Sequence, residues 1–279
     1  MTETPLHRRP IYPHCEKAGI RCYVPDAERD RTPPRPAVVV FPGGGYAYTA
    51  ECEFEPFVRT YLAAGYVVFA VRYAVGDDAA YPHALLDAAA ALAFVRARAA
   101  EFHIDPQKVA VCGFSAGGHV AALLGTQWHL PLLRETLGGE SADFRPDAMV
   151  LCYPVISGIR SPHQPSFRRL LGPSPSRAAL ENLSAEQKVD NRTPPAFLWH
   201  TANDDCVPAE NSLVMAGALA TAGVPVELHV FPNGPHGLSV CTRETAAGGS
   251  AERIYPYVGR WVALSVEFLE NVFYGGEFR

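Results

Sequence analysis

A serine flanked by glycines, in the pattern Gly-Phe-Ser-Ala-Gly at residues 113–117, constrains this chain of 279 residues more than any other feature. An apolar run at 109–112 precedes it, and a run typical of a helix, 119–124, follows it. A strand that enters a helix through so sharp a turn leaves no room for side chains beside the serine. The pattern therefore predicts that Ser115 is a nucleophile at the head of a helix, where backbone N–H groups point outward. A plain glycine-rich turn is the alternative.

Composition and charge narrow the class of protein. The hydrophobic fraction of 48% is enough for a large core, and the net charge of −5 comes with no basic stripe, which argues against a nucleic-acid partner. The first ten residues lack the apolar core of a secretory signal, and no apolar run is long enough to span a bilayer. We therefore expect a soluble, cytoplasmic protein without a membrane partner.

Strand-like runs alternate with helix-like runs along the chain, which predicts a mostly parallel central sheet flanked by helices. We expect one domain, 1–279, with an N-terminal extension at 1–35. The segment 154–195 is rich in Pro, Ser and Arg and has little periodicity, so it is expected to be an irregular insert with one or two short helices near the active site. The expected strands are 19–24, 36–41, 66–71, 109–112, 147–153, 196–200 and 226–231, and the expected helices are 53–64, 83–102, 209–222 and 255–272.

Two loops after late strands supply the partners that a serine nucleophile requires. A serine hydroxyl is a weak nucleophile until a base takes its proton, and an acid must orient that base. His236 lies on a loop rich in Pro and Gly after the strand 226–231 and is the predicted base. Asp204 and Asp205 follow the strand 196–200 and compete as the acid. The spacing Asp-x-x-Val-Pro before the next helix favours Asp204, with Asp205 as a structural or capping carboxylate.

A glycine run after an early strand completes the predicted chemistry. Acyl transfer needs hydrogen-bond donors for the negative oxygen that develops, and the N–H of Ala116, directly after the nucleophile, is one. Gly43, Gly44 and Gly45 follow the strand 36–41, where acyl-transfer enzymes carry a glycine loop. The alternatives are a flexible loop or a phosphate cradle, but no Lys-Ser/Thr follows the run and it lacks the spacing of a dinucleotide-binding loop.

Five segments carry a resemblance to a known family: 42–46 (Pro-Gly-Gly-Gly-Tyr), Tyr81-Pro82, 113–119, 200–204 and 231–237. They resemble the α/β-hydrolase superfamily, and most closely its acetyl-esterase and acetyl-xylan-esterase-like branch, often described as bifunctional acetyl and feruloyl esterases. The resemblance covers about residues 36–270 and implies an α/β-hydrolase fold. The roles that it implies are nucleophile for Ser115, acid for Asp204, base for His236, and oxyanion-hole donors for Gly44, Gly45 and Ala116.

The resemblance implies a serine carboxylesterase that hydrolyses short-chain acetyl esters, with an acetylated oligosaccharide as a candidate substrate. Two other classes of function compete with it. One is a small-substrate amidase, formamidase or peptidase on the same fold. The other is a binding protein on an inactive hydrolase fold, which the intact triad and glycine run argue against. The chemistry needs no cofactor, and the histidines lack the paired spacing of metal ligands, so no metal is expected.

Three residues beside these motifs are candidates for substrate contact. Tyr46 follows the glycine run, His119 follows the serine pattern, and Tyr153 ends the strand 147–153. Packing in the core or at the rim of the site is the alternative for each of them. The apolar stretch 268–278 makes a homo-oligomer interface a further expectation.

Overall fold

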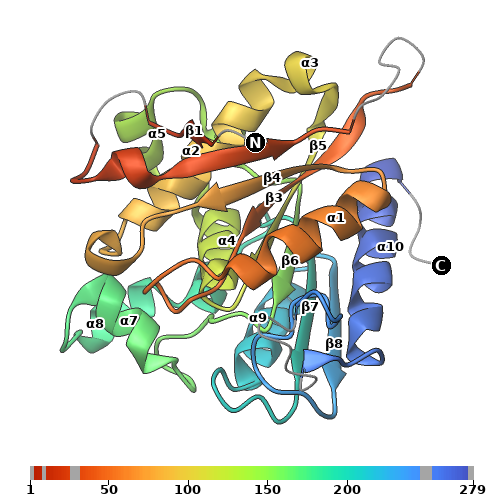
Figure 1. Ribbon diagram of the computed structural model, residues 1–279. Helices are drawn as coiled ribbons and strands as arrows, with labels where there is room; N and C mark the ends of the chain where they lie inside the picture. Colours follow the sequence, from red (N-terminus) through yellow and green to blue (C-terminus); the bar gives the residue numbers. More distant parts are fainter. Residues whose placement is uncertain (1–2, 8–10, 26–31, 246–252, 276–279) are drawn as a thin grey trace.

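One sheet runs through the protein, with the strand order β1-β2-β4-β3-β5-β6-β7-β8 (Figure 1). The computed structural model describes residues 3–7, 11–25, 32–245 and 253–275. Pairing is parallel from β4 to β8 in this order, while β1 and β2 join antiparallel at one edge. The fold is therefore the mostly parallel α/β sheet that the sequence predicts. The strands are β1 (Thr4–Pro5), β2 (Gly19–Tyr23), β3 (Arg35–Phe41), β4 (Val67–Arg72), β5 (Ile104–Phe114), β6 (Ala148–Cys152), β7 (Ala196–Thr201) and β8 (Val226–Phe231).

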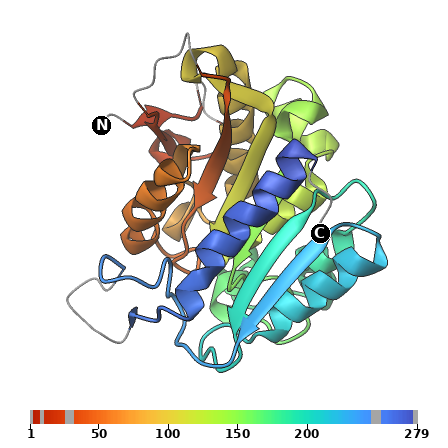
Figure 2. The ribbon, with the colours of Figure 1, turned by 90° about the vertical axis from the view of Figure 1, so that its right-hand side faces the viewer.

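Helices cover both faces of the sheet, which is why its central strands read as continuous apolar runs. Along β3, Val39 and Phe41 pack into one apolar layer with α2, α4 and α9, whereas Val38 and Val40 pack into the other with α1 and α10. Figure 2 shows α10 lying over the strands on this second face. The helices named here are α1 (Glu55–Ala63), α2 (His83–Ala97), α4 (Ala116–Gln127), α9 (Glu210–Thr221) and α10 (Trp261–Tyr274).

Several element boundaries differ from the expected ones. The single helix expected over 83–102 is two helices, because the backbone leaves helical geometry at Arg98 before α3 (Ala99–Phe102). The strand expected at 109–112 begins earlier, at Ile104, where polar residues hide the strand pattern. The last helix begins at Trp261, after the 3₁₀ turn η6 (Val258–Arg260), and not at residue 255.

The N-terminal extension predicted at 1–35 is part of the fold. Its strands β1 and β2 extend the sheet, and two of its side chains bind a buried carboxylate on α2. Tyr12 Oη donates to both oxygens of Asp87 at 2.7 and 2.8 Å, and His7 Nε2 lies 2.6 Å from Asp87 Oδ1. The N–H of Ala74 donates to Asp87 Oδ2 at 2.8 Å. These contacts attach the extension to the layer of helices. Residues 1–2, 8–10 and 26–31 lie outside the described part.

The predicted insert at 154–195 contains three short helical elements. They are α7 (Gln164–Leu171), α8 (Arg177–Asn182) and the 3₁₀ helix η4 (Ala185–Lys188), with α7 and α8 at the lower left in Figure 1. His163, the residue before α7, lies beside Gly45 in the glycine run of the predicted site. The insert therefore lies beside the predicted chemistry.

In the apolar stretch 268–278, Phe268 and Leu269 are buried in the layer that α10 forms with the sheet, whereas Tyr274 is 54% exposed. The interface expected for this stretch stays a prediction. Residues 276–279 lie outside the described part, and the homo-oligomer stays a prediction. In the ranges that the structure describes, every helix is too short or too polar to cross a membrane.

Replacement of Tyr12 tests whether the N-terminal segment stabilises the fold. Tyr12→Phe removes the hydroxyl that donates to buried Asp87, so we expect the free energy of unfolding to fall by about 2 kcal/mol, typical of a hydrogen bond to a charged group. Urea denaturation measures this change. Tyr48→Phe is the control, because Tyr48 is 62% exposed. Equal stability of the two variants would show that the segment is peripheral.

Candidate active site

Ser115 lies on a strained turn between β5 and α4, as its sequence pattern predicts. Its φ of 53° and ψ of −117° are rare for a residue with a side chain. The flanking glycines allow the backbone to approach itself closely. A Cβ atom on Gly113 would lie 2.2 Å from the carbonyl oxygen of Gly117, and one on Gly117 would lie 2.1 Å from that of Phe41. Glycine is therefore required at both positions.

The predicted triad residues lie in hydrogen-bonding contact. Ser115 Oγ is 2.8 Å from His236 Nε2, and His236 Nδ1 is 2.7 Å from Asp204 Oδ2. With the proton of the neutral ring on Nδ1, His236 donates to the carboxylate and accepts the proton of the serine hydroxyl. Of the two candidate acids, the structure thus brings Asp204 to His236, while Asp205 is exposed.

The carboxylate of Asp204 is buried but well supplied with donors. Its Oδ1 accepts the N–H groups of Cys206 and Val207, each at 2.9 Å. His200 Nε2 lies 2.8 Å from the Val207 carbonyl and 3.3 Å from Asp204 Oδ2, so its contact with Asp204 is the weaker one. Burial raises the pKa of Asp204, but the bonds from His200 and His236, the charge of His236 and the N–H of Val207 together hold that pKa well below its usual range. Asp204 is therefore ionised and fixed in orientation.

The glycine run lies directly beside Ser115. A Cβ atom on Gly43 would be 3.0 Å from Ser115 Cβ, and positive φ angles of 122° at Gly44 and 59° at Gly45 turn the chain there. Within the described ranges, no residue accepts a hydrogen bond from the backbone N–H of Gly44, Gly45 or Ala116. Unpaired N–H groups beside a serine hydroxyl are what an oxyanion hole provides.

A buried carboxylate on the same loop was not apparent from the sequence pattern. Glu53 accepts the N–H of Gly43 at 2.5 Å and the hydroxyl of Tyr153 at 2.7 Å. The Tyr153 hydroxyl also accepts the N–H of Ser239 at 3.0 Å, and its ring packs edge-on against the ring of His236, with 4.9 Å between centroids. Tyr153 is almost fully buried and contacts His236, which corrects the expectation that it contacts substrate.

Tyr46 and His119 lie behind the site, with no exposed surface. The Tyr46 hydroxyl donates to His119 Nδ1 at 2.8 Å, and His119 Nε2 donates to the carbonyl of Leu183 at 2.8 Å. The His119 ring packs edge-on against Phe167 in α7. This geometry corrects the expectation of substrate contact for both residues, because neither side chain has exposed surface. His119 fastens the insert to α4 through Leu183 and Phe167, and Tyr46 holds the other nitrogen of the His119 ring.

His163, the single histidine of the segment 154–195, lies at the site instead. Its Nδ1 is 2.8 Å from Ser166 Oγ and its Nε2 is 3.7 Å from Cys206 Sγ. A Cβ atom on Gly45 would lie 3.5 Å from His163 Cε1. The ring therefore lies between the glycine run and the loop that carries Asp204 and Cys206. Burial, then the charges of His236 and Arg169, lower the pKa of His163, which keeps it neutral.

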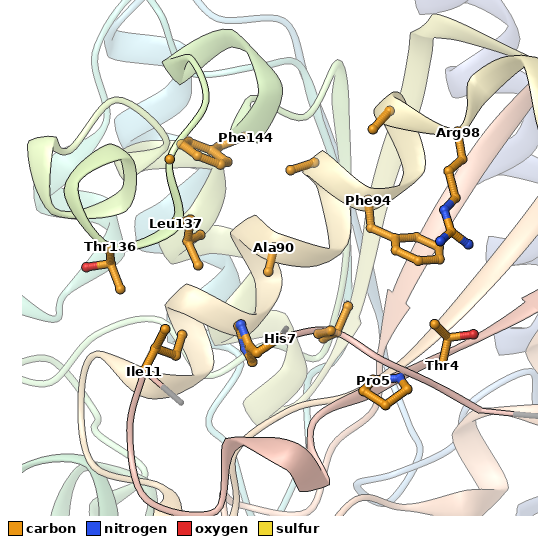
Figure 3. Close-up of a pocket in the computed structure, with 14 residues that line it drawn as sticks. Thr4, Pro5, His7, Ile11, Ala90, Phe94, Arg98, Thr136, Leu137 and Phe144 are labelled. Atoms are coloured by element: carbon orange, nitrogen blue, oxygen red, sulfur yellow. The ribbon is translucent and has the colours of Figure 1, made fainter. Parts of the chain in front are cut away.

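A separate pocket of about 780 Å³ lies between the N-terminal segment, α2, and the short helices α5 (Pro131–Leu137) and α6 (Ser141–Phe144). Figure 3 shows His7, Phe94, Leu137 and Phe144 around it, with Arg98 at one end. Its described lining residues are mostly apolar and include none of the predicted triad or oxyanion residues. The predicted chemistry therefore does not use it.

The buried histidine behind the site makes stability depend on pH. Burial lowers the pKa of His119 to about 4, from an ordinary value near 6.5. Between these values the unfolded chain binds a proton that the folded chain does not, so stability falls as the pH falls, by at most about 1.4 kcal/mol per pH unit. His119→Gln keeps an acceptor and a donor but does not titrate. Between pH 6.5 and 5, we expect the free energy of unfolding of this variant to fall by about 1 kcal/mol less than that of the wild type.

Urea denaturation at pH 6.5 and at pH 5 measures this difference. His14→Gln is the control, because the side chain of His14 is 59% exposed, and it should keep the pH dependence of the wild type. An identical pH dependence for His119→Gln and the wild type would contradict the neutral, buried state of His119.

A family model and several curated relatives match this chain. The BD-FAE family model matches residues 22–219. The Endo-1,4-beta-xylanase B of Butyrivibrio fibrisolvens is 37% identical over 77% of this chain and 34% of its own length. The acetylxylan esterase of Xylanibacter ruminicola is 28% identical over 81% of this chain and 45% of its own length. The chain thus spans between a third and a half of these relatives.

A solved structure agrees over nearly the whole chain. It is the acetyl ester-xyloside bifunctional hydrolase from Caldicellulosiruptor lactoaceticus, which is 34% identical, with a TM-score of 0.81 over 99% of this chain and 97% of that one. The strand-turn-helix geometry of the serine pattern, the family match over residues 22–219 and this likeness all agree. The chain belongs to the BD-FAE family and has the α/β-hydrolase fold.

Proposed function

We propose that this chain is a serine carboxylesterase that hydrolyses short-chain esters, acetyl esters above all, on a carbohydrate alcohol. The observation that carries the proposal is the contact chain from Ser115 through His236 to Asp204. It has the geometry of an activated nucleophile, because each side chain lies within hydrogen-bonding distance of the next. The unpaired N–H groups of the glycine run beside it add electrostatic stabilisation where the carbonyl oxygen would become negative.

The reaction proceeds in two steps. Ser115 Oγ attacks the ester carbonyl carbon while His236 Nε2 takes its proton, and the N–H groups of Gly44, Gly45 and Ala116 bind the oxyanion. Asp204 stabilises the imidazolium, which then protonates the departing alcohol oxygen as the C–O bond breaks. Water attacks the acyl-serine with His236 again as base, and the carboxylic acid leaves as Ser115 regains its proton.

Two observations support a small acyl group and a sugar alcohol. His163 stands 3.5 Å from the position of a Cβ atom on Gly45 and 3.7 Å from Cys206 Sγ, so it narrows the space beside the oxyanion donors. The relatives include proteins named acetylxylan esterase and acetyl ester-xyloside bifunctional hydrolase. A narrow acyl site that accepts acetyl groups fits the position of His163, and an alcohol part that contains xylose fits the names of the relatives.

Hydrolysis of p-nitrophenyl esters from acetate to octanoate tests the proposal. We expect kcat/KM of the wild type to be highest for acetate and to fall steeply with chain length. Ser115→Ala should lower kcat by about 10⁴-fold or more, because the remaining groups cannot replace the nucleophile. Acetylated xylo-oligosaccharides then test the alcohol.

Equal turnover by the wild type and Ser115→Ala would refute a serine mechanism. Absence of serine-dependent turnover on every ester would favour an amidase or formamidase, which anilide and formamide substrates would reveal. A protein inactive on all three substrate classes would be a binding protein on this fold.

Two neighbouring carboxylates allow a matched test of the acid. Asp204→Asn presents an amide to His236 Nδ1 and stabilises the wrong tautomer, so we expect kcat to fall by about 10⁴-fold. Asp205→Asn, one residue away and exposed, should leave kcat within about twofold of the wild type. Steady-state kinetics with p-nitrophenyl acetate measures both. A larger loss in Asp205→Asn than in Asp204→Asn would reverse the assignment of the acid.

A further inference from the structure

A buried carboxylate that the mechanism above does not use lies beside the nucleophile. Glu53 is only 3% exposed, and no Lys or Arg in the described ranges forms an ion pair with it. Burial raises the pKa of Glu53, and this effect is opposed by its hydrogen bonds from Tyr153 and Gly43 and by positive charge at His236 and Arg253. A buried carboxylate without an ion pair is costly unless donors satisfy it. The two groups that donate hydrogen bonds to Glu53, the Gly43 N–H and the Tyr153 hydroxyl, therefore indicate its role.

The first donor ties Glu53 to the glycine run. Glu53 Oε2 accepts the N–H of Gly43 at 2.5 Å, while the carbonyl of Gly43 accepts the N–H of Ala50 at 3.1 Å. The peptide groups on both sides of Gly43 are thus held, and a Cβ atom there would lie 3.0 Å from Ser115 Cβ. Because the N–H of Gly43 is occupied, the N–H groups of Gly44 and Gly45 are the ones left for an oxyanion.

The second donor ties Glu53 to the loop of the base. Glu53 Oε1 accepts the hydroxyl of Tyr153 at 2.7 Å, and that hydroxyl accepts the N–H of Ser239 at 3.0 Å. Ser239 lies three residues after His236, whose ring the Tyr153 ring contacts edge-on. One carboxylate therefore connects the oxyanion donors with the general base through two short hydrogen bonds and one shared hydroxyl.

We propose that Glu53 is a positioning residue for acyl transfer, which holds the glycine run and the His236 loop in one hydrogen-bonded unit around Ser115. The proposal rests on the esterase function proposed above. Electrostatic stabilisation of an oxyanion requires donors that are fixed before the charge develops, since reorganisation during the reaction would cost part of the benefit. Loss of this unit loosens the donors and the base together, and it affects the transition state more than the bound ester.

Glu53→Gln tests the proposal with little change of shape. The amide has one oxygen acceptor where the carboxylate has two, so it cannot accept from both Gly43 and Tyr153. We expect kcat on p-nitrophenyl acetate to fall about 10- to 100-fold, less than the 10²- to 10³-fold typical of losing an oxyanion donor outright, with KM within about threefold. Affinity for a short alkyl trifluoromethyl ketone, which forms a tetrahedral adduct with Ser115, should fall in proportion to kcat/KM.

Asp87→Asn is the matched control. Asp87 is also fully buried and also accepts a backbone N–H, from Ala74, and a tyrosine hydroxyl, from Tyr12, but its described partners are outside the triad and the glycine run. This variant should lose a similar free energy of unfolding while kcat stays within about twofold of the wild type. An equal loss of kcat in both variants would assign the effect to general destabilisation and would overturn the proposal.

Further outcomes separate the two proposals. Wild-type kcat in Glu53→Gln, with ester turnover still dependent on Ser115, would overturn the role of Glu53 and leave the esterase function in place. Absence of serine-dependent ester turnover in the wild type would refute the esterase function and the role of Glu53 with it. Tyr153→Phe keeps the bond between Glu53 and Gly43, and it should lower kcat several-fold even if Glu53→Gln does not fold. Wild-type kcat in Tyr153→Phe would overturn the link to the base.

Discussion

The close packing of backbone on backbone around Ser115 is the constraint on which the rest of the site depends. Gly117 lies against the carbonyl of Phe41, the last residue of β3, and Gly113 lies against Gly117 itself. These contacts join the end of β3, the end of β5 and the start of α4 within a few ångströms. The glycine run that leaves β3 therefore has to pass beside the serine. The strain of a positive φ at Ser115 is borne by the buried end of β5, residues 109–114, and by α4, which is buried along its whole length.

Much of this arrangement could be predicted because its signals are local. The serine pattern, the glycine run and the loops of Asp204 and His236 each follow a strand, and parallel strands bring the loops at their carboxyl ends to one edge of the sheet. The strand β8, 226–231, has the bounds that its alternation predicts. Where polar residues interrupt the apolar pattern, as at the start of β5, the local signals predicted a strand that is too short.

Contacts between distant parts of the chain could not be predicted in this way. Glu53 and Tyr153 are separated by 100 residues, and His7 and Asp87 by 80, so no local spacing relates them. The edge strand β1 is two residues long in a segment rich in Pro, and its place depends on its pairing with β2. His119 resembled a substrate contact because it follows the serine pattern, yet the direction of its side chain is set by Leu183 in the insert.

The position of His163 beside the glycine run and the loop of Asp204 has a consequence for the evolution of substrate specificity. The ring lies beside the glycine run and the loop of Asp204, in a segment that supplies none of the residues of the proposed triad or oxyanion hole. Substitutions in that segment can reshape the space beside the glycine run while Ser115, His236 and Asp204 keep their positions. Selection for a new substrate can therefore act on one short stretch of sequence, with the chemistry inherited intact.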